Sequence, residues 1–200
     1  MRFFISLIFI PLVLISQISS AFANTYKPSK RHEQQQTQST TNRGCTQSVT
    51  QFQILAPSDH IGKTASVQPT FLFWFDEFPQ SPLQISLTQP LMTAPLWQEK
   101  VNISKKGLFL LKVPQSLPLR DGNYVLTAEI PCSTQEDSSS FMRIAFRKVS
   151  LEEVEPQKSL AENGIWYDAL LSAWTTSKTD FEQLLEQVGI VLPDEKFEIF

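Results

Sequence analysis

Apolar and polar residues alternate through the middle of the chain, from about residue 45 to residue 149. Leu83, Ile85 and Leu87, for example, are separated by single polar residues, which is the period of a strand with one buried face. Prolines lie between the strand-like runs rather than inside them, as strand pairing requires. The pattern predicts an antiparallel, Ig-like β-sandwich. It is built from seven runs, at residues 51–54, 70–75, 83–88, 97–103, 108–113, 124–130 and 142–147.

The C-terminal quarter of the chain has the apolar period of helices instead. Ser159 with Glu162, and Thr179 with Glu182, match the capping box and predict two helix starts. Gly189 predicts the end of the second helix. Two helices joined by a short connection predict a hairpin, so we expect a mainly β fold, α+β as a whole, with a C-terminal α-helical hairpin.

The first residues have the order of an export signal. Arg2 is followed by an apolar run over residues 3–15 and by the small-x-small sequence Ala21-Phe22-Ala23. The run is too short to cross a bilayer core, so we expect cleavage after Ala23, no stable membrane span afterwards, and a periplasmic or extracellular protein. An uncleaved N-terminal anchor is the alternative. The predicted parts are a signal peptide (1–23), a disordered polar leader (24–43), a β-sandwich domain (44–150), a helical hairpin packed on or beside it (151–192) and a tail (193–200).

The charge is uneven along the chain. Residues 24–150 carry thirteen basic and nine acidic groups, whereas residues 151–200 carry three basic and eleven acidic groups. The acidic part disfavours a nucleic-acid partner. We interpret it as a solvated helical face rather than an acidic docking surface. The opposite charges of the two parts also favour its docking on the sandwich.

Two cysteines, Cys45 and Cys132, are the candidates for a structural disulfide, since cysteines of exported proteins more often bond than stay free. The alternatives are free thiols or redox chemistry. Neither C-x-x-C spacing nor a basic neighbourhood supports the redox reading.

Catalytic signals are weak. His32 lies in the polar leader, His60 follows Asp59 in a loop, and no nucleophile elbow, phosphate loop, dinucleotide fingerprint or metal-ligand pattern is present. We therefore predict no catalytic residue, no metal and no cofactor. The turn that ends in Tyr124 predicts a tyrosine corner, in which the phenol bonds to nearby backbone.

A dense aromatic stripe lies on the first predicted helix. It consists of Trp166, Tyr167, Asp168, Leu170 and Trp174. Such a stripe is usually helix-on-sheet core, and the alternative is a ligand groove or docking stripe. Gly164, just before it, is either merely tolerated or marks a close approach by another element.

Several of these features occur together in one known family. They are Arg43-Gly44-Cys45, the aromatic strand that contains Trp74-Phe75, the turn Gly122-Asn123-Tyr124, and the helical string Gly164-Ile-Trp-Tyr-Asp-Ala-Leu170. Over residues 43–192 the chain resembles the cyanobacterial exported family named domain of unknown function 928. The resemblance implies a bacterial exported protein, and it implies no reaction and no ligand.

Two classes of function remain. The first is a non-enzymatic cell-envelope protein whose sandwich binds another envelope protein or a surface polymer. The second is an exported hydrolase or carbohydrate-active enzyme. The scarcity of His, Cys and clustered carboxylates favours the first class, because such an enzyme needs a constellation of these groups.

Overall fold

The computed structural model describes residues 25–28, 36–38, 52–131 and 139–193. The predicted signal peptide (1–23) and all but the first residue of the predicted tail lie outside these ranges. No helix in the described part of the chain is long and apolar enough to cross a membrane.

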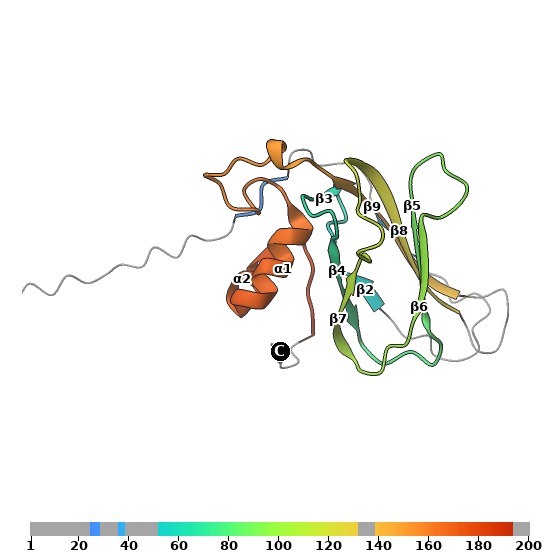
Figure 1. The fold of residues 1–200 in the computed structure, drawn as a ribbon. Helices are drawn as coiled ribbons and strands as arrows, with labels where there is room; N and C mark the ends of the chain where they lie inside the picture. Colours follow the sequence, from blue (N-terminus) through green and yellow to red (C-terminus); the bar gives the residue numbers. More distant parts are fainter. Residues whose placement is uncertain (1–24, 29–35, 39–51, 132–138, 194–200) are drawn as a thin grey trace, which may run out of the picture.

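Two β-sheets pack face to face, and a pair of helices forms a third layer (Figure 1). Sheet A has the strand order β1-β9-β8-β5-β6, with β3 also paired to β9, and sheet B has the order β2-β4-β7. The strands of sheet A are β1 (Gln36–Gln38), β3 (Gly62–Thr64), β5 (Leu83–Thr88), β6 (Trp97–Val101), β8 (Gly122–Pro131) and β9 (Ser139–Lys148). Those of sheet B are β2 (Phe52–Ile54), β4 (Thr70–Phe75) and β7 (Gly107–Lys112). The predicted mainly β fold with a C-terminal helical pair is confirmed.

All seven predicted strands are present, and the structure adds β1 and β3, which sequence reasoning missed. Both contain three residues, too few to show a period. β3 pairs with β9 in parallel, whereas every other described strand pair is antiparallel. The alternating pattern predicts purely antiparallel sheets, and the β3–β9 pair makes sheet A mixed instead.

The core lies between the sheets and is rich in aromatic rings. Phe71, Phe73 and Phe75 occupy alternate positions of β4 and are fully buried. Phe71 meets Phe146 of β9 with ring centroids 4.9 Å apart in an edge-to-face arrangement. Leu72, which faces the opposite side of β4, is also buried, at 1% exposure. Strand β4 is thus covered on both faces, as its continuous apolar run predicts.

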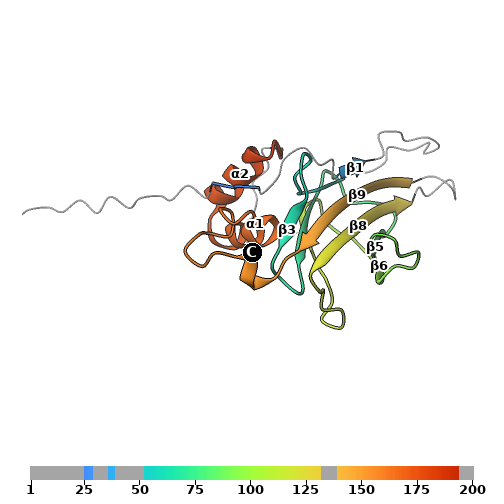
Figure 2. The same ribbon diagram turned by 90° about the horizontal axis from the view of Figure 1, so that it is seen from above.

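The helical layer covers the other face of sheet B. It comprises α1 (Trp166–Thr176) and α2 (Lys178–Gln187), and a short 3-10 helix (Leu151–Glu153) precedes it. Figures 1 and 2 show α1 and α2 on the side of the molecule away from β8, β5 and β6. The indole of Trp166 donates a 2.9 Å hydrogen bond to the carbonyl of Leu55, just after β2. The hairpin therefore packs on the sandwich.

The first helix begins later than the sequence predicts. Ser159 and Glu162 do form the reciprocal capping box, with bonds of 3.1 Å and 3.2 Å, but they close only a single turn. Gly164 ends that turn at φ +70°, and α1 starts two residues later at Trp166. A left-handed glycine stops a helix after one turn as readily as after several. A Cβ at Gly164 would also lie 2.8 Å from the carbonyl oxygen of Lys27. Of the two interpretations of Gly164, the close approach of another element is therefore confirmed.

The second helix is capped by Ser177 rather than Thr179. The Ser177 hydroxyl accepts a 3.2 Å hydrogen bond from the backbone N–H of Asp180. The predicted end at Gly189 is confirmed, since its φ is +73° and the next residue, Ile190, bonds back to the carbonyl of Leu185 at 2.9 Å.

The polar leader is not disordered where the structure describes it. Tyr26 is buried, at 4% exposure, and its backbone N–H donates a 2.7 Å hydrogen bond to the side chain of Gln187 at the end of α2. The N–H of Lys27 bonds to the carbonyl of Ala161 at 3.0 Å. Further along, β1 pairs with the edge of sheet A (Figure 2). A single aromatic side chain and backbone hydrogen bonds therefore order segments whose composition predicted a flexible leader over residues 24–43.

Candidate functional site: a polar hollow on the outer sheet

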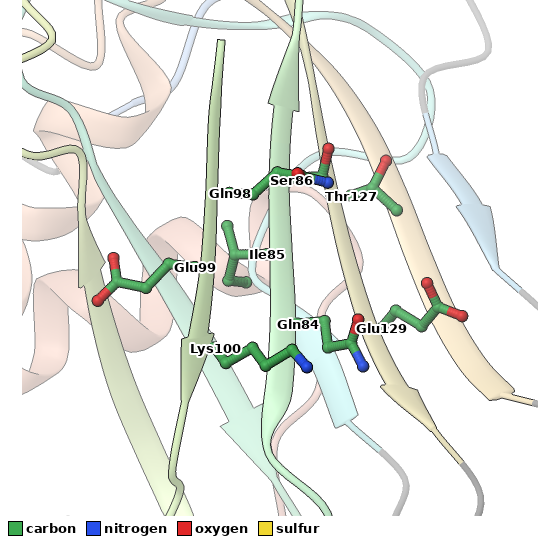
Figure 3. A pocket seen from close by; sticks show the side chains of 8 residues that line it. All are labelled: Gln84, Ile85, Ser86, Gln98, Glu99, Lys100, Thr127 and Glu129. Atoms are coloured by element: carbon green, nitrogen blue, oxygen red, sulfur yellow. The ribbon is translucent and has the colours of Figure 1, made fainter. Parts of the chain in front are cut away.

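A hollow of about 460 Å³ lies over three adjacent strands of sheet A, β6, β5 and β8. Eight residues line it: Gln84, Ile85, Ser86, Gln98, Glu99, Lys100, Thr127 and Glu129 (Figure 3). Six of them carry polar side chains on one face of the sheet. Regular strand pairing places these six next to one another.

The strand register arranges the six side chains in two rows. Gln84 pairs with Lys100 on one side and with Glu129 on the other. Directly paired residues of antiparallel strands have Cβ atoms about 4.5–5.5 Å apart, so each row is continuous across the three strands. The second row, two residues along, is Gln98, Ser86 and Thr127.

The alternation of β5 sends these side chains outward. Leu83, Ile85 and Leu87 are buried in the core, at 2% exposure or less, so the residues between them face solvent. Figure 3 shows Gln84 and Lys100 projecting to one side of their strands, whereas Glu99 projects to the other. The hollow is therefore the solvent side of a strand whose opposite side is core.

Both rows continue onto β9. Thr127 pairs with Arg143, and Glu129 pairs with Phe141. The Nε of Arg143 donates a 3.3 Å hydrogen bond to the hydroxyl of Thr127. A partly exposed aromatic ring and an exposed guanidinium thus border the polar rows on the side of β9.

The composition of the hollow suits binding better than acid–base chemistry. Gln amides both donate and accept hydrogen bonds, and Ser and Thr hydroxyls do the same. Among the described residues that line it, Glu129 alone places a carboxylate on this face. Lys100 lies two strand spacings away from Glu129, about 10 Å, with Gln84 between them.

A second polar constellation lies beneath the N-terminal segment. The imidazole of His60, only 2% exposed, contacts Asp59 through Nδ1 at 2.6 Å and the hydroxyl of Tyr26 through Nε2 at 2.7 Å. Tyr26, His60 and Asp59 thus lie in the order of a nucleophile, a base and an orienting carboxylate. The phenol, however, is itself buried, and its ring packs edge-on against Trp166 at 4.9 Å. The constellation therefore holds chain segments together, and the expectation that His60 is a simple loop residue misses its burial.

The aromatic stripe of α1 is core. Trp166, Tyr167, Leu170 and Trp174 are all buried, at 8% exposure or less, so they present no docking surface in this structure. This agrees with the interpretation as helix-on-sheet core. The fifth residue, Asp168, is partly exposed.

Asp168 fixes the chain after β3. Its Oδ2 accepts a 3.1 Å hydrogen bond from the backbone N–H of Ala65. Burial raises the pKa of the Asp168 carboxyl, while hydrogen bonds from Thr64, Ala65 and Ser66 act in the opposite direction. Burial also raises the pKa of the neighbouring Tyr167 phenol, whose hydroxyl has no hydrogen-bond partner among the described residues.

The remaining predictions divide into tested and untested ones. The tyrosine corner is confirmed, because the hydroxyl of Tyr124 donates a 2.9 Å hydrogen bond to the carbonyl of Arg120. Cys45 and Cys132 both lie outside the described residues, so their disulfide stays a prediction. Within the described residues, no group of three or more His, Cys, Asp and Glu side chains is placed to hold a metal ion.

A model of one protein family matches residues 36–191, a range that begins at β1 and ends just after α2. The chain belongs to the family Domain of Unknown Function (DUF928). The family named from the sequence features is thereby confirmed, whereas its cyanobacterial origin and its export stay predictions. No curated protein matches the chain, and no solved structure matches it. Because the family name states no activity, the function of this DUF928 chain has to be argued from its site.

Proposed function

We propose that this DUF928 chain is an exported, non-enzymatic module of the bacterial cell envelope that binds a polysaccharide on the outer face of sheet A. The observation that carries the proposal is the double row of hydrogen-bonding side chains across β6, β5 and β8. The export signal read from residues 1–23 supports the location.

A polysaccharide matches this surface chemically. Sugar hydroxyls both donate and accept hydrogen bonds, and so do Gln84, Gln98, Ser86 and Thr127. Phe141, which continues one row on β9, offers a partly exposed apolar ring beside these groups. The hollow extends over three adjacent antiparallel strands, which suits an extended chain rather than a small enclosed ligand.

A protein partner fits less well. Protein interfaces concentrate their binding energy in buried aromatic and apolar anchors at the centre of the contact. The centre of this hollow is Gln84 and Ser86, and both are polar. The hydrogen-bonding rows therefore favour a hydroxyl-rich polymer over an apolar protein surface.

A hydrolase or carbohydrate-active enzyme also fits less well. Glycoside hydrolysis generally uses two carboxyl groups, roughly 5–9.5 Å apart, on either side of the scissile bond. Glu129 is on the binding face, but Glu99 projects from the opposite side of its strand (Figure 3). The geometry supports holding a sugar chain rather than cleaving it.

Affinity electrophoresis of residues 24–200 through gels that contain envelope polysaccharide tests the proposal. Ser86→Trp fills the centre of the hollow with an indole, and Ser172→Trp, at an exposed position of α1, is the matched control. Blocking two or three hydrogen bonds of about 0.5–1.5 kcal/mol each should weaken binding by at least about fivefold for Ser86→Trp. Unchanged retardation of a folded Ser86→Trp variant, or no retardation of the wild type by any polysaccharide tested, contradicts the proposal. Retardation by added envelope protein alone points to a protein partner instead.

A further inference from the structure

The charged side chains on the outer face of sheet A are mostly basic. Lys63, Lys100, Arg143 and Arg147 occupy outward positions of β3, β6 and β9, whereas Glu129 is the acidic residue at such a position on the described strands. Lys63 and Arg147 are paired across β3 and β9, so two of the cations are direct neighbours. Arg147 also lies 3.9 Å from Glu153, which offsets part of its charge.

Two of these cations stand at opposite ends of the polar rows. Lys100 is on β6, and Arg143 is three strands away on β9. Arg143 is in the other row, two residues along, so three strand spacings and two residue rises separate their backbone positions by about 16 Å. Both side chains are exposed, and the bond from Arg143 to Thr127 uses one of the five N–H donors of its guanidinium. A polymer that crosses from Lys100 to Arg143 therefore meets a cation at each end and the neutral side chains of Gln84, Ser86 and Thr127 between them, while Glu129 lies at the far end of the Lys100 row.

The opposite side of the molecule carries the opposite charge. Residues 151–193 contain two basic and eight acidic side chains, and they form the helical layer on the far side of sheet B. The described sandwich residues 52–131 and 139–150 contain nine basic and six acidic side chains. Such a distribution repels an anionic chain from the helices and attracts it to the sandwich.

We infer that the polymer bound by the hollow is an acidic polysaccharide, whose carboxylate or sulfate groups pair with Lys100 and Arg143 while its hydroxyls bond to the rows between them. This inference rests on the proposed function and specifies its ligand. A charged group at each end sets the register of the chain, because Arg and Lys bind carboxylate and sulfate oxygens through charge-assisted hydrogen bonds. The neutral side chains of Gln84, Ser86 and Thr127 alone do not discriminate an acidic polymer from a neutral one.

Calorimetric titration of residues 24–200 at 0.15 M salt with four polymers tests the inference. The polymers are polygalacturonate, dextran sulfate, neutral dextran and single-stranded DNA. The test variant is the double substitution Lys100→Gln/Arg143→Gln. Its matched control is Lys105→Gln/Lys112→Gln, which removes the same charge from exposed lysines beside and within β7 of sheet B.

The test variant should bind polygalacturonate or dextran sulfate at least about tenfold more weakly than the wild type, and the control should stay within about twofold. Whichever of the two acidic polymers binds more tightly identifies the anion. Neutral dextran should bind more weakly than either, and the test substitutions should leave its affinity unchanged. Raising the salt concentration should weaken acidic-polymer binding to the wild type more than to the test variant.

The outcomes separate this inference from the proposed function. If Ser86→Trp abolishes binding but Lys100→Gln/Arg143→Gln does not weaken it, the inference is overturned and the polysaccharide site stands. If the Lys105→Gln/Lys112→Gln control loses as much affinity, or if DNA binds as tightly as the acidic polysaccharides, the attraction is a general one to polyanions and the inference is wrong. If neither the Ser86 nor the charge variant changes binding, both proposals fail.

Discussion

Tyr26 ties the N-terminal segment to the body of the protein by a hydrogen bond that one substitution removes. Tyr26→Phe keeps the ring, so the stacked contact with His60 (5.4 Å) and the edge contact with Trp166 (4.9 Å) remain. The change deletes only the phenolic oxygen, 2.7 Å from Nε2 of His60. The effect on stability therefore reports on this contact rather than on lost packing.

The expected cost follows from the burial of the partner. His60 is 2% exposed, so water cannot readily replace the lost hydroxyl. A buried polar atom left without its partner costs about 1–3 kcal/mol. We therefore expect Tyr26→Phe to lower the free energy of unfolding by about 1–3 kcal/mol, or the midpoint of thermal unfolding by roughly 2–4 °C for each kcal/mol.

Urea unfolding followed by tryptophan fluorescence measures this cost, and Tyr124→Phe is the matched control. The Tyr124 hydroxyl bonds to the backbone carbonyl of Arg120, an exposed residue at a turn, where water can take its place. Its loss should cost only about 0.5–1.5 kcal/mol. Tyr26→Phe should therefore be the more damaging of two chemically identical changes.

A double-mutant cycle with His60→Phe isolates the polar contact. The cost of the double variant should fall short of the sum of the single costs by about 1–2 kcal/mol, because removing both polar partners leaves neither unsatisfied. Two results together would refute the docking of residues 25–28. One is that the costs of the two single variants add up to the cost of the double variant within about 0.5 kcal/mol, and the other is that Tyr26→Phe itself costs no more than about 0.5 kcal/mol.

Further predictions concern the helical layer. Gly164→Ala should cost about 1–3 kcal/mol in urea unfolding, because φ is +70° and the new Cβ would lie 2.8 Å from the Lys27 carbonyl; Gly189→Ala, at φ +73° but in open space, should cost less. Because burial raises the folded-state pKa of Asp168 above its unfolded value of 3.8, the folded protein binds more protons between the two values, so stability falls as pH rises through that window. Asp168→Asn should flatten this dependence in urea titrations between pH 3 and 6. Since apolar packing and the Trp166 bond hold the hairpin, the protease resistance of residues 151–193 should be indifferent to salt; a strong loss at about 1 M salt would favour electrostatic docking instead.

The strand pattern was readable from the sequence because burial on one face imposes a period of two. Thr70–Phe75 and Leu83–Thr88 match the predicted runs at both ends. The tyrosine corner at Tyr124 and the helix end at Gly189 were also predictable, because each depends on local backbone chemistry. Features set by neighbours along the chain are thus the ones that the sequence reveals.

Features set by residues far apart in the chain were not predictable in the same way. Tyr26 is a single aromatic residue in a polar segment, and its burial depends on Gln187 and Trp166, more than 130 residues away. The hollow could not be predicted from the sequence, because it depends on which strands pair and in what register. Gln84 and Ser86 looked like ordinary solvent-facing strand residues until the register placed polar partners on both sides of each.

Mapping the bound polymer on the protein tests the central claim most directly. Backbone amide chemical shifts of isotopically labelled residues 24–200 can be followed by NMR during titration with polygalacturonate or dextran sulfate fragments. The account predicts that the largest changes fall on β5, β6 and β8, around Gln84, Ser86 and Thr127, and reach Arg143 on β9. Changes confined to the helices or to β7, or none at saturating polymer, would contradict it.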